Sequence, residues 1–491
     1  MPVQLARSAL PALAQRLSVP LYDPAAITPG ILHFGVGNFH RAHQAVYLDD
    51  LFNHGGDPSW GIIGTGVRPA DRQMHDALAA QDWLTTVVAQ EAAGSTARVT
   101  AAMVGFIPPG ERRAIVNRLA DPAIRIVSMT VTEGGYYIDP ATQAFDPTHP
   151  EIVADARAFD SAQTVFGLIL LGLKRRRDIG IPPFTVMSCD NLPGNGHVAR
   201  NAVTGLAALV YPELARWVEA NVAFPNGMVD RITPATGDRE RAIAADQFGV
   251  ADAWPVFCED FRQWVLEDEF PLGRPALEDV GVEFVADVAP WELMKIRILN
   301  GGHAAIAYPA GLLDIEFVHE AMAHDLVARF LDRVETTEIL PVVPPVPSTD
   351  LDAYRRLVAR RFANPKIGDT VRRLCLDGSN RQPKFILPTV RDRLAQGAPV
   401  DGLALVGALW CRYCHGATES GRPIEPNDPS WDRLVAQSAR ARENPAAWLE
   451  MRDIHGDLAD HPVYAAAFSR ALRDLWGDGT AATLARYLAG G

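Results

Sequence analysis

The first half of the chain alternates short apolar runs with longer stretches of helical periodicity. The apolar runs are rich in Ile, Val and Phe and end in Gly or polar residues, as in "GILHFGVG", "WGIIGTGV", "IRIVSMTVTEGG" and "FTVMSCDNLPGNG". Strands that alternate with helices in this way are typical of a parallel sheet covered on both faces. We therefore predict a doubly wound α/β domain. Ligands of such sheets bind beyond the carboxyl ends of the strands, so residues directly after the apolar runs are the candidates for function.

The second half of the chain has a different pattern. From about residue 288 helical periodicity dominates, most clearly in "FVHEAMAHDLVARFLDRVETTEIL" and "GLALVGALWC". A chain of 491 residues is also too long for one hydrophobic core. We predict an α/β domain over residues 1–287 and a mainly α-helical domain over residues 288–491, with an extended proline-rich connector at residues 340–350.

The charge balance excludes one class of partner. The 46 Lys and Arg residues against 59 Asp and Glu residues give a net charge of −13, the opposite of a nucleic-acid binder. The one basic run, Lys174 to Arg177, follows an apolar stretch of 10 residues, and we predict that it is the solvated end of a helix. That stretch is too short to span a membrane, and the N-terminus lacks the apolar run of a signal peptide. We expect a cytoplasmic protein.

The five cysteines do not suggest a disulfide framework. The segment "CRYCH", Cys411 to His415, matches the haem-attachment pattern and half matches a redox pair. It ends an apolar helical stretch, however, and not a strand-to-helix turn. We therefore predict buried structural cysteines in this segment.

A glycine motif follows the first predicted strand. In "ILHFGVGNFHRAH" the glycines 35 and 37 occupy the first two positions of the dinucleotide fingerprint, but His40 replaces the third glycine. The first two glycines allow a tight turn and the close approach of a pyrophosphate, although a plain tight turn is the alternative. The predicted cofactor-binding residues at this turn are Gly35, Val36, Gly37, Asn38 and Phe39.

An acidic residue at the end of the second strand normally holds the adenosine ribose of NAD. Asp71 is the acid available in "WGIIGTGVRPADR", further from the glycines than the usual spacing of about 20 residues. Arg68 lies close by, and an arginine there can accept the additional phosphate of NADP. We favour NAD as the cofactor and leave NADP open.

Polar residues also follow the later strands. Glu133 comes after "IRIVSMTVT", and Asp190 and Asn191 come directly after "FTVMSC". Asp, Asn, Pro and Gly are turn formers, so an Asx turn alone would explain the second group. Asp230 and Arg231 are similarly ambiguous, because they could form an ion pair on a loop.

The segment "WELMKIRILNGGH", residues 291–303, places polar side chains among aliphatic residues of a helix. At about 100° per residue, Asn300 and His303 share a face with Lys295, and Arg297 lies on the opposite side. A lysine is rarely buried without a partner or a function. The alternative is that Lys295 extends to solvent while His303 bonds a backbone carbonyl. No cluster has convincing metal-ligand spacing, so we expect a metal-independent site.

Taken together, six segments resemble the polyol-specific long-chain dehydrogenase/reductase family. They are "GVGNFHRAHQAVYLDDL", "TVTEGGYYID", "FTVMSCDNLPGNG", "FPNGMVDRITP", "WELMKIRILNGGH" and "DGSNRQPKFILPT", and they occur in the family's order. The resemblance implies a Rossmann-type domain, a helical C-terminal domain and a zinc-free, NAD-dependent oxidation of a polyol to a ketose. It also implies a monomer. Among possible substrates it favours D-mannitol, which would give D-fructose, and leaves D-arabinitol, D-sorbitol and sugar uronates as alternatives.

The resemblance also implies roles for individual residues. The family's lysine motif falls on Lys295, the general base, Asn300, and His303, which positions the substrate. Asn191 and Asn300 resemble the pair that stabilises the alkoxide oxygen, and Glu133 is similar to a glutamate that assists proton movement to solvent. The residues similar to those that line the polyol are Asp230, Arg373 and Lys384, with Arg381 an alternative in the last segment. Where relatives carry two adjacent acids, this chain has Ala70 and Asp71, which weakens the expected discrimination against NADP.

This chemistry gives the buried lysine a purpose. A secondary alcohol cannot release hydride until its proton has moved to a base, and hydrogen-bond donors must stabilise the developing oxyanion. A lysine can act as that base only when it is neutral, which aliphatic surroundings favour. A dinucleotide-binding regulatory protein without catalysis is the alternative from another class of function.

Overall fold

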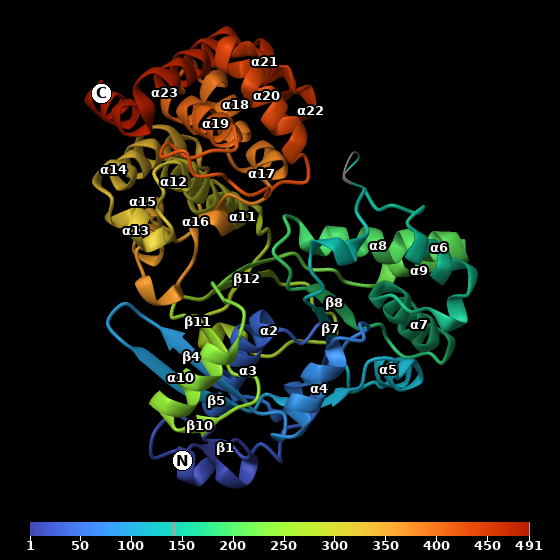
Figure 1. The fold of residues 1–491 in the computed structure, drawn as a ribbon. Coiled ribbons are helices and arrows are strands. Elements are labelled where there is room, and N and C mark those ends of the chain that lie inside the picture. Colours follow the sequence, from blue (N-terminus) through green and yellow to red (C-terminus); the bar gives the residue numbers. More distant parts are fainter. Residues whose placement is uncertain (140–141, 143, 491) are drawn as a thin grey trace. The chain divides into compact units, whose positions relative to one another are not determined.

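The computed structural model describes residues 1–139, 142 and 144–490. The chain divides into two units, Met1–Ala289 and Pro290–Gly491, whereas the sequence placed the boundary between residues 287 and 288. Within the described residues, all strands belong to the first unit and the second is helical (Figure 1). The predicted fold class, a doubly wound α/β domain followed by a mainly helical domain, is confirmed.

The central sheet of the first unit has five parallel strands in the order β6-β3-β2-β7-β8. The strands are β2 (Pro29–Phe34), β3 (Gly61–Thr65), β6 (Met103–Ile107), β7 (Ile126–Met129) and β8 (Thr185–Ser188). The chain reverses its direction of travel across the sheet between β2 and β7, as in Rossmann-type domains. Phe34 pairs with Thr65 and Met129, and Met129 pairs with Ser188. The carboxyl ends of these strands therefore form one edge.

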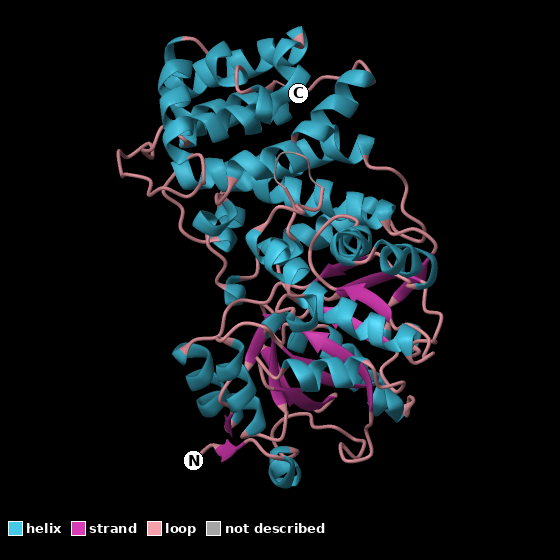
Figure 2. Cartoon of the chain, turned by 90° about the vertical axis from the view of Figure 1, so that its right-hand side faces the viewer, coloured by secondary structure: helices cyan, strands magenta, loops and turns pink. Residues whose placement is uncertain are grey.

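Helices cover both faces of this sheet because side chains alternate along each strand (Figure 2). Leu32 and Phe34 pack into one apolar cluster, which includes side chains of α5 (Arg112–Leu119), α7 (Val165–Asp178) and α8 (Asn195–Val210). Ile31 faces the other cluster, with α3 (Gln44–Asn53) and α4 (Asp71–Ala79). Burial on both faces explains why the strands are almost continuously apolar in sequence.

Smaller sheets and helices complete the first unit. One mixed sheet has the order β11-β4-β5, a second has the order β13-β12-β9, and β1 pairs with β10. These strands are β1 (Val3–Gln4), β4 (Thr85–Gln90), β5 (Ser95–Thr100), β9 (Gly227–Asp230), β10 (Val250–Ala251), β11 (Val256–Glu259), β12 (Gln263–Glu267) and β13 (Glu283–Val285). The remaining α-helices are α1 (Leu10–Leu13), α2 (Asn38–Ala42), α6 (Pro150–Arg157), α9 (Pro212–Asn221) and α10 (Asp238–Phe248).

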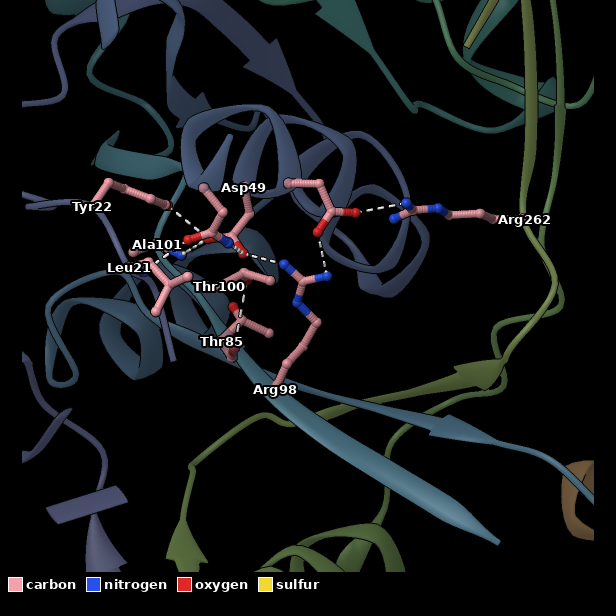
Figure 3. Close-up of polar contacts among 10 residues, drawn as sticks. Leu21, Tyr22, Asp49, Thr85, Arg98, Thr100, Ala101 and Arg262 are labelled. Atoms are coloured by element: carbon pink, nitrogen blue, oxygen red, sulfur yellow. Dashed lines mark hydrogen bonds and ion pairs between the residues drawn. The ribbon is translucent and has the colours of Figure 1, made fainter. Parts of the chain in front are cut away.

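A buried carboxylate on α3 connects several of these pieces. Asp49, which is fully buried, accepts hydrogen bonds from the Tyr22 hydroxyl (2.6 Å) and the Ala101 backbone N–H (3.0 Å), and pairs with Arg98 of β5 (Figure 3). Arg98 also reaches the neighbouring Asp50 (2.6 Å). A buried carboxylate is tolerated only when donors surround it, and here they come from the loop at Tyr22 and from the end of β5.

The basic run at the end of α7 is only partly solvated, so the sequence prediction was wrong for one residue. Arg176, in the last turn of α7, is fully buried. It donates to the backbone carbonyls of Leu119 (2.7 Å), Pro182 (2.9 Å), Asp121 (2.5 Å) and Ile124 (2.5 Å). One guanidinium thus provides donors to four backbone carbonyl oxygens in the segments that flank α7 and β7.

The second unit is built from helices around α12 (Gly301–Leu312), which is buried along most of its length. The other α-helices are α11 (Ala289–Met294), α13 (Val318–Ala323), α14 (Asp325–Val334), α15 (Leu351–Phe362), α16 (Val371–Leu374), α17 (Gly378–Phe385), α18 (Leu387–Ala395), α19 (Asp401–Tyr413), α20 (Trp431–Glu443), α21 (Ala446–Leu449), α22 (Arg452–His455) and α23 (Pro462–Ala489). Two π-helical segments, η6 (Lys295–Asn300) and η7 (Glu335–Ile339), extend α11 and α14.

The five cysteines are all buried and free. Cys411 and Cys414 lie at the end of α19, as the sequence predicted for buried structural cysteines. Among the described residues, no helix is both long and apolar enough to cross a membrane.

Candidate active site

The turn after β2 has the geometry of a dinucleotide-binding turn. Gly35 adopts a φ of 90°, and a Cβ built on it would lie 2.1 Å from the carbonyl oxygen of Thr130. A Cβ on Gly37 would meet only the Gly35 oxygen, at 3.8 Å. The first glycine is therefore required by the fold, whereas the second leaves open space beside the backbone at the start of α2. This division matches the two functions of the fingerprint glycines.

The third position of the fingerprint departs from glycine for a visible reason. His40 is buried, and its ring stacks on His33 of β2 with 3.5 Å between the centroids. Burial lowers the pKa of His33 to about 3 and that of His40 well below its usual value, so both rings are neutral at pH 7. A stack of flat, neutral rings replaces the close helix-to-strand packing that glycine normally permits.

Thr130, directly after β7, and His33 of β2 hold the same turn, whereas Asn38 and Phe39 of α2 contact other residues. The Thr130 hydroxyl donates to the Gly35 carbonyl oxygen (2.6 Å), and His33 Nε2 lies 3.1 Å from that hydroxyl. Asn38 donates to the Pro234 carbonyl oxygen (3.1 Å), so its side chain is directed to a neighbouring loop. Phe39 stacks on His43 with 4.8 Å between the ring centroids. The sequence did not single out Thr130 or His33.

Asp71 is the first residue of α4 and closes the loop after β3. Its Oδ2 accepts the Arg68 backbone N–H (3.0 Å) and would lie 2.1 Å from a Cβ on Gly66. The Arg68 guanidinium donates to the Val131 carbonyl oxygen at 3.1 Å. The acid is thus fixed at the end of the second strand of the fingerprint, and the nearby arginine is directed to the loop after β7.

The loops after β7 and β8 are joined by a buried carboxylate. Asp190 accepts the backbone N–H groups of Val131 and Thr132, each at 2.9 Å, and the hydroxyl of Tyr136 at 2.7 Å. In an Asx turn the Asp190 side chain would bond the backbone of its own loop. It bonds the loop after β7 instead, so the Asx turn considered from the sequence is not what the Asp190 side chain forms. Glu133 and Asn191, the residues that follow, are both exposed to solvent.

Asp230 ends β9 and is buried. The neighbouring Arg231 donates to the backbone carbonyl oxygens of Glu259 (3.0 Å) and Ala42 (2.5 Å). The guanidinium therefore connects β11 with α2.

The lysine motif of the second unit lies in a π-helical segment. Lys295 begins η6 and is buried with 7% of its surface exposed, and Asn300 ends η6. His303 lies in the first turn of α12, and its ring stacks on Phe362 with 4.2 Å between the centroids. A π-helical turn inside a helix is uncommon and often marks a functional position.

This segment also corrects the α-helical wheel used for the sequence. A π-helix bonds i to i+5 and places an additional residue in each turn, so angles at 100° per residue do not apply to residues 295–300. Arg297, predicted on the face opposite Lys295, is buried with 6% of its surface exposed. It pairs with Asp392 and donates to the Val342 carbonyl oxygen.

Of the two adjacent glycines, Gly302 is the one required by close packing. A Cβ on Gly302 would lie 2.7 Å from Oε1 of Glu335 on η7, whereas a Cβ on Gly301 would meet its nearest atom at 3.6 Å. Burial raises the pKa of Glu335 well above its usual range, although Arg355 opposes this shift. η7 therefore brings a buried carboxyl group to α12, and η7 also contacts η6.

The candidate polyol-lining residues between positions 373 and 384 differ in their surroundings. Arg373 on α16 is paired with Asp369, and Arg381 on α17 donates to the carbonyl oxygens of Arg373 (3.3 Å) and Leu374 (3.1 Å). Lys384 is exposed at the end of α17. The structure thus places Arg381 beside Arg373. Within residues 1–139, 142 and 144–490, no group of three or more His, Cys, Asp or Glu side chains could hold a metal ion.

Two family models cover nearly all of the chain. The mannitol dehydrogenase Rossmann domain matches residues 29–279, and the mannitol dehydrogenase C-terminal domain matches residues 287–476. The chain belongs to the mannitol dehydrogenase family. This confirms the family resemblance found in the sequence.

Other members of the mannitol dehydrogenase family are similar along their full length. A mannitol 2-dehydrogenase of Cereibacter sphaeroides is 61% identical over 97% of this chain and 100% of that protein. A mannitol 2-dehydrogenase of Aspergillus fumigatus is 39% identical over 96% of each chain.

Two solved structures share the fold. A mannitol 2-dehydrogenase of Pseudomonas fluorescens, in a ternary complex with NAD and D-mannitol, has a TM-score of 0.88, 41% identity and full coverage of both chains. A D-sorbitol dehydrogenase in substrate-free form has a TM-score of 0.91 and 36% identity, over 98% of this chain and 100% of its own.

Proposed function

We propose that this protein is an NAD-dependent mannitol 2-dehydrogenase that interconverts D-mannitol and D-fructose. The observation that carries the proposal is its likeness to the Cereibacter enzyme, which extends through both units at 61% identity. The Pseudomonas complex, which contains NAD and D-mannitol, supports the same pair of ligands. The geometry adds a turn suited to a dinucleotide in one unit and a buried lysine in the other.

The residues at the carboxyl edge of the sheet fit a dinucleotide. The open space at Gly37 allows the backbone at the start of α2 to approach a pyrophosphate. We assign to Asp71 the hydrogen bonds from the ribose hydroxyls, and Val36, Asn38 and Phe39 would complete the turn. When bound, the nicotinamide would accept the hydride from the alcohol carbon.

The chain's own residues would then manage the proton and the charge. We assign to Lys295 Nζ the removal of the proton from the C2 hydroxyl of mannitol, which leaves an alkoxide that can form the carbonyl as hydride departs. The side-chain amides of Asn191 and Asn300 would donate to the oxygen, and His303 would orient the substrate. Glu133 would pass the proton to solvent, and Asp230, Arg373 and Lys384 would contact the polyol chain, with Arg381 an alternative to Lys384.

A panel of polyols tests the proposal. With NAD, we expect D-mannitol to give the highest kcat/KM, ahead of D-sorbitol, D-arabinitol and D-mannonate, measured by the absorbance of NADH. D-Sorbitol is the second candidate, because the substrate-free D-sorbitol dehydrogenase shares the fold at a TM-score of 0.91. NADH binding without turnover of any of the four compounds would contradict the proposal and favour a regulatory protein.

Asp71 should control the choice between NAD and NADP. Its carboxylate would repel the 2′-phosphate of NADP and accept bonds from the ribose of NAD. Asp71→Asn removes the charge and retains an acceptor for the Arg68 N–H, so we expect the NADP/NAD ratio of kcat/KM to rise by about tenfold, or ~1.4 kcal/mol. Asp76→Asn on the same helix, the control, should leave the ratio unchanged. An unchanged ratio in Asp71→Asn would remove the ribose assignment.

We also propose that the protein is a monomer of the cytoplasm. Its five cysteines are free and buried, as in proteins of reducing compartments. Sedimentation equilibrium at micromolar concentration should give a particle mass of 53.4 kDa, the mass of one chain. A larger mass would contradict the monomer.

A further inference from the structure

The residue before Glu133 has a strained backbone. Thr132 adopts φ 65° and ψ 165°, a region that is populated almost entirely by glycine. Threonine is β-branched, and positive φ is a marked outlier for such residues. The Thr132 side chain is exposed, so packing of that side chain does not explain the conformation. Glycine occurs at positions 134 and 135 of this loop but not at the position whose φ would suit it.

A buried carboxylate holds this strained residue. Asp190 Oδ1 accepts the Thr132 N–H, and Oδ2 accepts the Val131 N–H and the Tyr136 hydroxyl. That hydroxyl also lies 2.5 Å from Ser188 Oγ, which accepts the Asp190 backbone N–H at 3.2 Å. The carboxylate is 8% exposed, so these charge-assisted bonds are formed away from water. They fix the strained residue from both ends of the loop.

We propose that Asp190 is a positioning residue, whose carboxylate keeps Thr132 in its strained conformation and thereby sets the placement of Glu133 relative to Asn191. This rests on the proposed function, in which these two residues act on proton and oxyanion. Asp190 directly precedes Asn191, and Thr132 directly precedes Glu133. A loop that needed only stability would avoid strain at residue 132, because strain of this kind persists only where surrounding contacts impose it.

The proposal predicts that a glycine at position 132 compensates for the loss of the carboxylate. Asp190→Asn preserves volume but replaces one of the two carboxylate oxygens with an NH2 group that cannot accept an N–H, and it removes the charge that strengthens the remaining bond. Threonine would then leave the positive-φ region, whereas glycine occupies it without penalty. We expect Asp190→Asn to lower kcat for mannitol by about 30-fold or more while the Kd for NADH changes less than threefold. In the Thr132→Gly background the same substitution should cost at least fivefold less in kcat.

A matched control separates positioning from stability. Asp155 is also buried, and its carboxylate accepts the N–H groups of Gln163 (2.7 Å) and Thr164 (3.0 Å) and the Thr164 hydroxyl (2.6 Å). Among the residues that the structure describes, no hydrogen bond joins the Asp155 side chain to either of the two strand-end loops. We expect both Asp155→Asn and Asp190→Asn to lower the Tm, and Asp155→Asn to leave kcat unchanged. Tyr136→Phe, which removes one bond to Asp190, should lower kcat by about threefold to tenfold and also be compensated by Thr132→Gly.

Two results would overturn the proposal: a normal kcat in Asp190→Asn, or a loss in kcat of the same size with glycine at position 132. If Asp190→Asn does not fold, the Tyr136→Phe pair decides by the same criteria. Amide hydrogen exchange tests the clamp, the hold of the Asp190 carboxylate on Thr132, without reference to activity. We expect the amides of residues 131–136 to exchange at least tenfold faster in Asp190→Asn than in wild type. If the wild-type protein turns over no polyol but Asp190→Asn still exchanges faster, the proposed function is contradicted and the clamp is not. If exchange is the same in the two proteins, the clamp is contradicted.

Discussion

Lys295→Ala is expected to lower the turnover of mannitol by about 10³-fold, within the range of 10²–10⁴ attributed to general acid–base catalysis. The side chain is buried at the start of a π-helical turn, where water cannot readily substitute for its amine. The Kd for NADH should change less than threefold, because the proposed dinucleotide residues lie elsewhere in the sequence. Initial rates of NADH formation and fluorescence titration measure the two quantities.

Two further measurements make this test specific for a base. A small primary amine such as methylamine should restore part of the turnover of Lys295→Ala, with the rate rising with the amine concentration. Lys366→Ala, which changes a partly exposed lysine of the same unit, is the control and should retain normal turnover. Near-normal turnover in Lys295→Ala would reject Lys295 as the general base.

Arg176→Met is expected to produce the largest loss of stability in the first unit, about 3–5 kcal/mol. The variant leaves four backbone carbonyl oxygens without the guanidinium that now donates to them. It also removes the stacking of the guanidinium on Phe184, at 4.9 Å from the ring centroid. Calorimetry should show the corresponding transition shifted down by about 5–10 °C.

The neighbouring arginine provides the comparison. Arg177 contacts the partly exposed Asp178 at 3.5 Å, and surface pairs of this kind contribute about 0–1 kcal/mol. Arg177→Met should therefore shift the transition by no more than about 1–2 °C. Equal shifts in the two variants would show that the buried bonds of Arg176 are not the source of stability.

The fold class was readable from the sequence because it depends on periodicity. Parallel strands that are buried on both faces must be apolar, and the glycines at 35 and 37 follow the first of them at the position where a nucleotide turn needs them. The same patterns indicated helices after residue 288. Family motifs, which preserve residue types at fixed spacing, then gave the roles proposed for Lys295, Asn300 and Asn191.

Contacts between distant segments were not readable in the same way. Arg176 looked like a surface residue because a charged side chain at a helix end is usually solvated. Only the packing of α7 shows that its guanidinium is buried and donates to backbone carbonyl oxygens. The wheel at residues 295–300 failed because residue types alone do not specify a π-helical bond pattern. Asp190 looked like a turn former, since the N–H groups that it accepts lie about 60 residues away in the chain and come close only when β7 and β8 pair.

The sequence by itself thus determined the parallel sheet, the helical second unit and the family, because hydrophobic period and motif spacing are properties of neighbours in the chain. Only the tertiary structure decided that Thr132 is strained, that Asp190 holds it, and that His40 stacks on His33 where a glycine was expected. Each of these depends on which strands lie side by side, and strand pairing brings together atoms whose separation in the sequence carries no local signal.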